Sequence, residues 1–132
     1  MDTPAGPQVV TGGPGDTAET LGFELHAPDT WLDSEEPVYS VIAGTIAEAS
    51  YRAGDKEVLN IRKAAGNDDI SGDYNEYESE TVLILDGLSI TCRGNNDLWN
   101  LLLWTKGGYT YAAGIPDGIR TEDIAELVSS IE

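Results

Sequence analysis

Residues 81–92 read TVLILDGLSITC, and this stretch gives the clearest local indication of the fold. Two runs rich in aliphatic and β-branched residues lie on either side of Asp86 and Gly87. An Asp-Gly pair favours a two-residue type I′ turn, because both central residues of that turn need positive φ. The stretch therefore predicts a tight antiparallel hairpin inside a β-rich domain.

Strand patterns continue on both sides of this hairpin. Further strands are expected over residues 23–27, 38–43, 47–52, 57–64, 98–104 and 109–113. Residues 57–64 also fit a helix capped by Asp55, but the flanking turn residues favour a strand. Residues 98–104 read LWNLLLW and are apolar on both faces, which is typical of a central strand.

The pattern changes from strand to helix near the end of the chain. Ile124, Leu127, Val128 and Ile131 recur at helical spacing, and we expect Thr121 to cap this helix. A short helix is expected over residues 16–22. The predicted fold class is α+β: a meandering, curved antiparallel sheet of about six or seven strands, with a short N-terminal helix and a C-terminal amphipathic helix packed on one face.

The 132 residues are enough for one domain with a core of its own. Residues 1–15 hold three prolines and four glycines without a periodic apolar pattern. We expect them to be a flexible linker and residues 16–132 to be a single α+β domain.

The net charge of −17, from 24 acidic and 7 basic residues, restricts the partners. Nucleic acids and anionic membrane surfaces both require a basic surface, so we expect neither. No apolar run approaches the roughly 20 residues of a membrane span, and no signal peptide is visible. Because the chain starts with a stalk-like segment, we expect an export signal or anchor to precede it in the full-length protein.

Five stretches, taken in order, resemble a known family. They are ETLGFELHAPDTW, AEASYRAGDKEVLNIRKAAG, DISGDYNEY, LLLWTKGGYTYAA and RTEDIAELVSSI. Together they resemble domain-of-unknown-function family 4367 over residues 16–132. The resemblance implies an extracytoplasmic domain of a membrane-anchored protein or lipoprotein of Gram-positive bacteria. It also implies that DISGDYNEY connects two strands, and it supplies no catalytic mechanism.

Residues 67–78 read NDDISGDYNEYE and match the spacing of an EF-hand calcium loop in part. Position one is Asn67 where that motif requires aspartate, and a strand is expected where the exiting helix should stand. We interpret the stretch as an acidic connection between strands. The alternative is a weak calcium site, with ligands from Asp69, Ser71, Asp73 and Glu78; no other cofactor is expected.

The residues that could carry catalysis are few. Cys92 shares a strand face with Leu88 and Ile90, so we expect a small buried apolar group instead of a nucleophile. His26 is expected to be exposed near a strand end, with no base or nucleophile at a suggestive spacing. We therefore expect no enzymatic activity, and a hydrolase based on carboxylates or a metal ion is the less favoured alternative.

Aromatic residues outside the predicted core are the remaining indication of function. Trp31 lies in a loop, and Tyr74 and Tyr77 lie in the acidic connection. Trp31 is expected either to cover the sheet edge or to bind a ligand. Trp99 and Trp104 should lie on opposite faces of their strand, one of them under the final helix.

The function expected from these features is a monomeric, extracytoplasmic interaction or sensing domain, held at the cell surface. Its partner would be a protein, a peptide or a glycan of the cell envelope, with Trp31, Tyr74 and Tyr77 as the ligand-binding residues. A carbohydrate-binding module of the cell envelope is the alternative.

Overall fold

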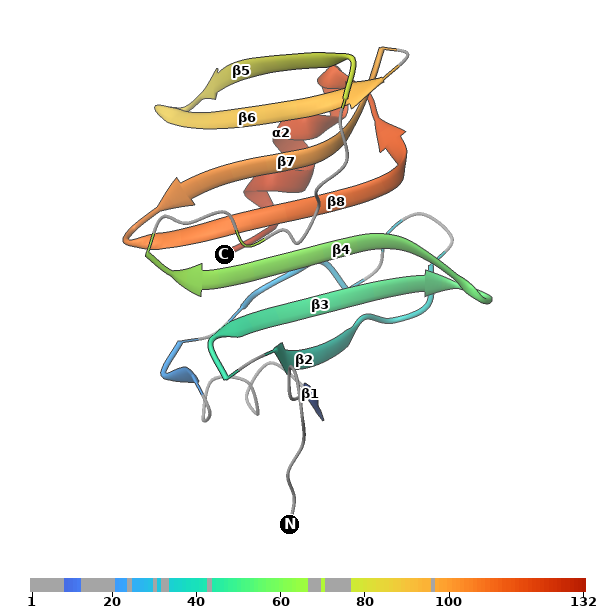
Figure 1. The fold of residues 1–132 in the computed structure, drawn as a ribbon, viewed down its shortest axis with the longest axis vertical. Helices are drawn as coiled ribbons and strands as arrows, with labels where there is room; N and C mark the ends of the chain where they lie inside the picture. The colour runs from blue at the N-terminus through green and yellow to red at the C-terminus, as the bar shows by residue number, and fades with distance from the viewer. Residues whose placement is uncertain are drawn as a thin grey trace.

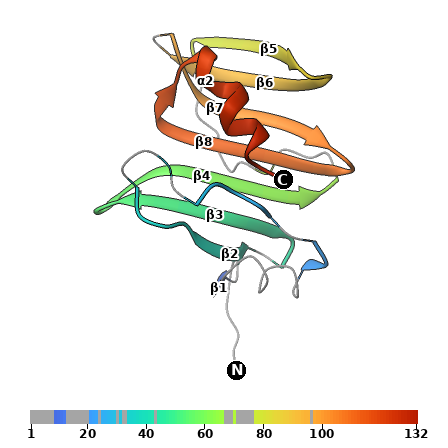
Figure 2. The same cartoon turned by 180° about the vertical axis from the view of Figure 1, so that it is seen from behind.

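A computed structural model describes residues 9–12, 21–23, 25–29, 31, 34–42, 44–66, 70, 77–95 and 97–132. Its elements are β1 (Val9–Gly12), β2 (Val38–Ile42), β3 (Ile46–Ala53), β4 (Lys56–Ala65), β5 (Ser79–Leu85), β6 (Leu88–Asn95), β7 (Leu98–Lys106), β8 (Tyr109–Ile119) and α2 (Thr121–Ser129). All strands belong to one antiparallel sheet, and α2 lies across one face of it (Figure 1 and Figure 2). The predicted α+β class is confirmed.

The sheet consists of two four-stranded meanders joined at their centre. Its order is β1-β2-β3-β4-β8-β7-β6-β5, so β4 pairs with the last strand instead of the next one. The joining ladder runs from Asn60 opposite Gly114 to Ala65 opposite Tyr109. The chain therefore passes from the middle of the sheet to its outer edge between β4 and β5, and the predicted connection between two strands is confirmed.

The strand β1 differs from the expectation, because it falls in residues 1–15, for which the sequence predicts a flexible linker. Val9, Val10 and Thr11 are β-branched, which suits a strand, and they pair with β2. This strand brings the sheet to eight strands. Of the short helix expected over residues 16–22, only Leu21 and Gly22 are among the described residues, and Leu21 is helical.

The predicted hairpin at Asp86 and Gly87 is present. Their φ angles are +51° and +82°, and Leu85 pairs with Leu88 directly across the turn. The expected strand over residues 23–27 is wrong, since residues 25–28 form no part of the sheet. Instead, His26 and Glu132 exchange two backbone hydrogen bonds of 2.8 Å, which fix this segment to the end of the chain.

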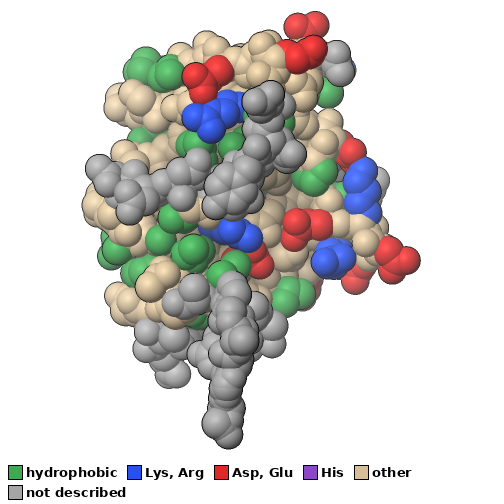
Figure 3. Space-filling model, in the orientation of Figure 1, with side chains coloured by type: hydrophobic (Ala, Val, Ile, Leu, Met, Phe, Trp, Pro, Cys, Tyr) green, Lys and Arg blue, Asp and Glu red, His purple; other side chains and the backbone are tan. Residues whose placement is uncertain are grey.

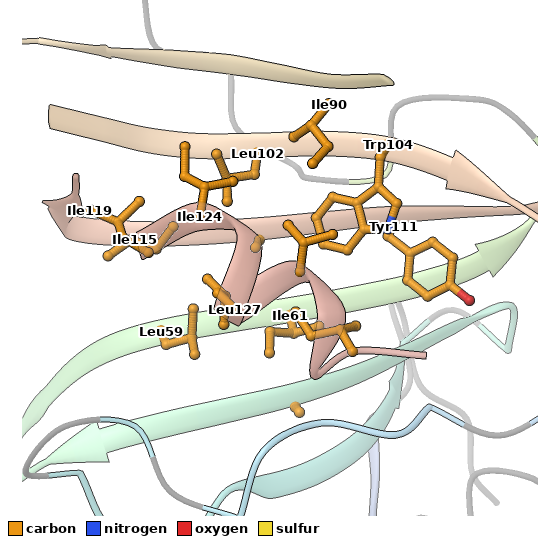
Figure 4. Close-up of a cluster of buried hydrophobic side chains, with 14 of the residues drawn as sticks. Leu59, Ile61, Ile90, Leu102, Trp104, Tyr111, Ile115, Ile119, Ile124 and Leu127 are labelled. Carbon is orange, nitrogen blue, oxygen red and sulfur yellow. The ribbon is translucent and has the colours of Figure 1, made fainter. Parts of the chain in front are cut away.

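The main core lies between the sheet and α2 (Figure 4). The predicted stripe of Ile124, Leu127, Val128 and Ile131 is buried there, against side chains such as Leu102. Each buried aliphatic side chain contributes about 1.5–3 kcal/mol. These contacts hold the helix on the sheet without a side-chain cap. The predicted cap is wrong, because Arg120 occupies the N-cap and Thr121 is the first helical residue.

A β-bulge at Asn100 overturns the expected orientation of the two tryptophans. The pairing of β7 shifts register next to Asn100 with respect to both neighbouring strands, β6 and β8. An extra residue reverses the alternation of side chains along a strand. Trp99 therefore packs against the same core cluster that contains Trp104, and its Nε1 donates a hydrogen bond of 2.8 Å to Thr121 Oγ1. No helix in the described residues is long and apolar enough to cross a membrane.

Candidate ligand-binding groove beside helix α2

A groove of about 580 Å³ lies where α2, the end of β8 and residues 28–31 meet. We call it the Trp31 groove. Its apolar lining residues are Pro28, Trp31, Leu98, Ile119 and Leu127, and its polar ones are Asp117, Arg120, Asp123, Glu126 and Ser130. An apolar floor with a few polar groups is the usual character of a ligand site.

The bulge at Asn100 shapes one wall of the groove. The Asn100 side chain donates from Nδ2 to the carbonyls of Ile115 and Pro116, at 3.1 and 3.2 Å. These bonds satisfy backbone groups of β8 where its pairing with β7 is interrupted. Gly118 then takes a φ of +82°, and a Cβ atom there would lie 2.6 Å from Leu98 Cβ. Glycine is therefore required where β8 passes the groove.

Hydrogen bonds hold Trp31 in place beside the groove. The Trp31 N–H donates to Ser34 Oγ at 3.0 Å, and the Ser34 N–H donates to the Trp31 carbonyl at 2.9 Å. The buried Tyr51 hydroxyl donates to the Pro28 carbonyl, which ties the same segment to β3. Trp31 is half-buried, and it packs against the core while lining the groove. The expected role of Trp31 in ligand binding stays a prediction.

The polar rim carries mainly negative charge. Asp117, Asp123 and Glu126 line the groove with one cation, Arg120. Asp117 is shared with Lys56 through an exposed ion pair of 2.6 Å, which contributes little stability in water. Among the described residues, no group of three acidic, histidine or cysteine side chains could hold a metal ion. The rim is therefore suited to accept hydrogen bonds or to attract a cationic group.

The other predicted site residues lie elsewhere. Tyr77 is half-buried just before β5 and does not line the groove. Glu78 is exposed, and its backbone N–H donates to Asn95 Oδ1 at 2.7 Å. Tyr74 and the other predicted calcium ligands, Asp69, Ser71 and Asp73, lie outside the described residues. The structure therefore brings none of the other described candidates next to Trp31.

A second arrangement that the sequence analysis missed surrounds Lys63. This lysine is only 7% exposed, and its Nζ lies 4.6 Å from the ring centroid of Tyr109. The rings of Tyr111 and Phe23 lie at 5.4 and 5.5 Å. Aromatic faces attract a cation and make its burial less costly. Lys63 and Tyr111 lie opposite one another where β4 pairs with β8. The alternation of side chains along each strand does not reveal which strands pair, so the sequence alone could not bring these two residues together.

Cys92 is fully buried, as expected, and its thiol donates to the Ile90 carbonyl at 3.6 Å. Burial raises the pKa of Cys92 to about 11. At neutral pH the thiol is therefore protonated and shielded, which does not suit a nucleophile. His26 is exposed, as expected.

Alkaline pH is expected to weaken the fold through this thiol. A raised pKa stabilises the folded state below the unfolded-state pKa, and that contribution is lost as the pH rises through the folded-state pKa. We expect the free energy of unfolding to fall by about 2 kcal/mol between pH 8 and 10.5 because of Cys92. Burial also raises the pKa values of Tyr39, Tyr51 and Tyr111, which adds to the loss. Urea unfolding of the wild type and of Cys92→Ala at both pH values isolates the thiol, since equal losses would contradict its role.

Comparison with family models, with curated proteins and with solved structures finds no match. The resemblance to family 4367 therefore stays a prediction from the sequence.

Proposed function

We propose that this chain is a non-enzymatic, extracytoplasmic interaction domain that binds its ligand in the Trp31 groove. The observation that supports the proposal is the half-buried indole beside three carboxylates in one open groove. Indole rings supply a large contact area and are frequent anchors of binding sites. The carboxylates favour a ligand with cationic groups, such as a basic peptide segment of a partner protein.

A cell-envelope glycan is the second candidate. A sugar ring stacks on an aromatic face, and its hydroxyls donate to carboxylates such as Asp123 and Glu126. The two candidates differ in their response to salt. Binding of a basic peptide weakens as ionic strength rises, whereas binding of an uncharged sugar does not.

The test is an NMR titration of the protein with two probes, an acetylated peptide of alternating lysine and leucine and a chitin oligosaccharide. We expect one probe to shift the Trp31 indole signal and the backbone signals around Ile119 and Leu127. Trp31→Ala should then weaken that binding at least about tenfold, or 1.4 kcal/mol. Tyr77→Ala, which removes a half-buried aromatic residue outside the groove, should leave it unchanged.

The pair Asp123→Asn and Glu126→Gln separates the candidates further. If the ligand is cationic, this double variant should weaken the peptide and reduce the salt dependence. Failure of both probes to shift any groove signal would contradict the proposal. Conversion of either probe to a product would replace it with the hydrolase alternative.

A further inference from the structure

The strand β5 forms one edge of the sheet, and its outer side is open (Figure 1 and Figure 2). Across the two-residue turn, Leu85 and Leu88 form the pair closest to the hairpin end, and the ladder continues without a register shift. In such a hairpin the first pair is hydrogen-bonded, and bonded pairs then alternate along the strands. The backbone groups of Glu80, Val82 and Ile84 therefore point away from β6. Among the described residues, none of these outward groups has a hydrogen-bond partner.

The side chains at this edge are also unprotected. Val82 and Ile84 are 54% and 64% exposed, and both lie on the face away from α2. Figure 3 views this face, with β5 at the top. Protein edges are usually blocked by charged side chains, a proline, a bulge or a very short strand. β5 has seven residues, SETVLIL, with no proline and no bulge, and its one charged residue, Glu80, forms an ion pair with Arg93. Its edge is therefore available to another strand.

The charges at the ends of β5 disfavour a second copy of the same chain. A symmetric antiparallel pairing centred on Val82 would set Asp86 opposite Glu78 of the other copy. A pairing centred on Leu83 would set Asp86 opposite Glu80. Like charges placed opposite one another destabilise a strand pair, and each copy also carries a net charge of −17. A foreign strand with basic ends avoids both conflicts.

We propose that β5 binds an extended segment of a partner protein by strand addition. The segment carries apolar side chains at alternate positions, which pack on Val82 and Ile84, and basic residues at both ends, which face Glu78 and Asp86. Backbone hydrogen bonds to Glu80, Val82 and Ile84 hold it in place. Glu80 already pairs with Arg93 at 2.6 Å, so the basic ends act on the two outer carboxylates. This surface is separate from the Trp31 groove, and it uses none of the residues that line the groove.

The test uses the synthetic peptide acetyl-KTVTVTTTK-amide, labelled for fluorescence anisotropy, because its two lysines have the same spacing along a strand as Asp86 and Glu78. We expect saturable binding to the wild-type protein, with backbone NMR shifts concentrated in β5. Two control peptides probe the chemistry. N-methylation of both valines removes the donors that face β5, and glutamate in place of both lysines reverses the end charges. Each change should weaken binding at least tenfold at low salt.

Protein variants probe the surface itself. Val82→Pro removes one outward N–H without breaking the ladder to β6, and Ile84→Lys places a charge on the exposed face. Both should abolish the anisotropy change. Val38→Lys is the matched control, because Val38 is 50% exposed on β2, far from this edge. It should bind the probe as the wild type does, as should Trp31→Ala.

Sedimentation of the free protein tests the competing occupant. If the wild type sediments as a dimer and Val82→Pro as a monomer, a second copy of the chain covers the edge, and the proposal is overturned. The absence of any probe binding to the folded wild type would also overturn it. Equal binding of the basic-ended and acidic-ended peptides would contradict the assigned end charges.

Discussion

Replacing Gly94 by alanine is expected to destabilise the protein by at least about 3 kcal/mol, at the upper end of the effects seen for overpacked sites. A Cβ atom at this position would lie 1.9 Å from the Leu98 carbonyl oxygen and 2.7 Å from Trp99 Cα. Both atoms belong to the backbone of β7, so no side-chain rotation can relieve the contact. Either β6 and β7 separate or their pairing shifts. Urea unfolding monitored by circular dichroism measures the loss.

Gly114→Ala provides the matched control. Gly114 is also a strand glycine, in β8, and a Cβ atom there would meet nothing closer than the Asn60 carbonyl oxygen at 4.0 Å. Its φ is not positive, so alanine is compatible with the backbone. We expect a change of less than about 1 kcal/mol. Similar losses for the two variants would contradict the close approach of β6 and β7 at Gly94.

The same contact connects stability to the Trp31 groove. Gly94 pairs with Trp99 beside the bulge, and the Trp99 side chain donates a hydrogen bond to Thr121, the first residue of α2. A shift of β7 at this point therefore displaces Trp99 and, through this hydrogen bond, the start of α2, which lines the groove. In the remaining folded fraction, Gly94→Ala should therefore also change the NMR signals of Asp123 and Glu126, whereas Gly114→Ala should not.

Local features of the fold were predictable because their causes are local. Asp86 and Gly87 define a turn by their own backbone preferences, and the apolar spacing of Ile124 and Leu127 defines a helix face. The pairing of β4 with β8 has no such local cause. It joins residues about 50 positions apart, and a period-two pattern is the same whichever neighbour a strand has.

The bulge at Asn100 illustrates a second limit. Residues 98–104 read as one uninterrupted apolar strand, and only the carbonyls of Ile115 and Pro116 explain why an asparagine interrupts it. Because of that residue, Trp99 turns toward α2, and the expected alternation of the two tryptophans is lost. The error followed from assuming a regular strand.

The candidate site could be predicted only in part for the same reason. Trp31 was identifiable as an aromatic residue in a loop between strands. The carboxylates of the rim come from the end of β8 and from α2, and they reach the groove only after the bulge and the helix are in place. In a chain with 24 acidic residues, no sequence pattern distinguishes these three from the rest.

Trp104→Ala is expected to remove about 3–5 kcal/mol from the free energy of unfolding. Trp104 is 3% exposed, and its ring stacks on Tyr111 at 5.3 Å with an interplanar angle of 1° (Figure 4). Its removal leaves a cavity between the sheet and α2 and also breaks the aromatic pair, which adds about 0.5–1.5 kcal/mol. Trp104→Phe keeps a stacking ring and should lose less than half as much. A loss below about 1 kcal/mol for Trp104→Ala, measured by urea unfolding, would contradict the core position of this ring.

The effect should extend to Lys63, because Tyr111 lies between the two residues. The Tyr111 ring stacks on Trp104 on one side and contacts the Lys63 ammonium group at 5.4 Å. A Tyr111 ring without its stacking partner is less fixed, so it holds the buried cation less well. In a double-mutant cycle of Trp104→Ala with Lys63→Met, we therefore expect a coupling of about 0.5–1 kcal/mol. Strict additivity would show that the Tyr111 ring does not couple Trp104 to the Lys63 cation.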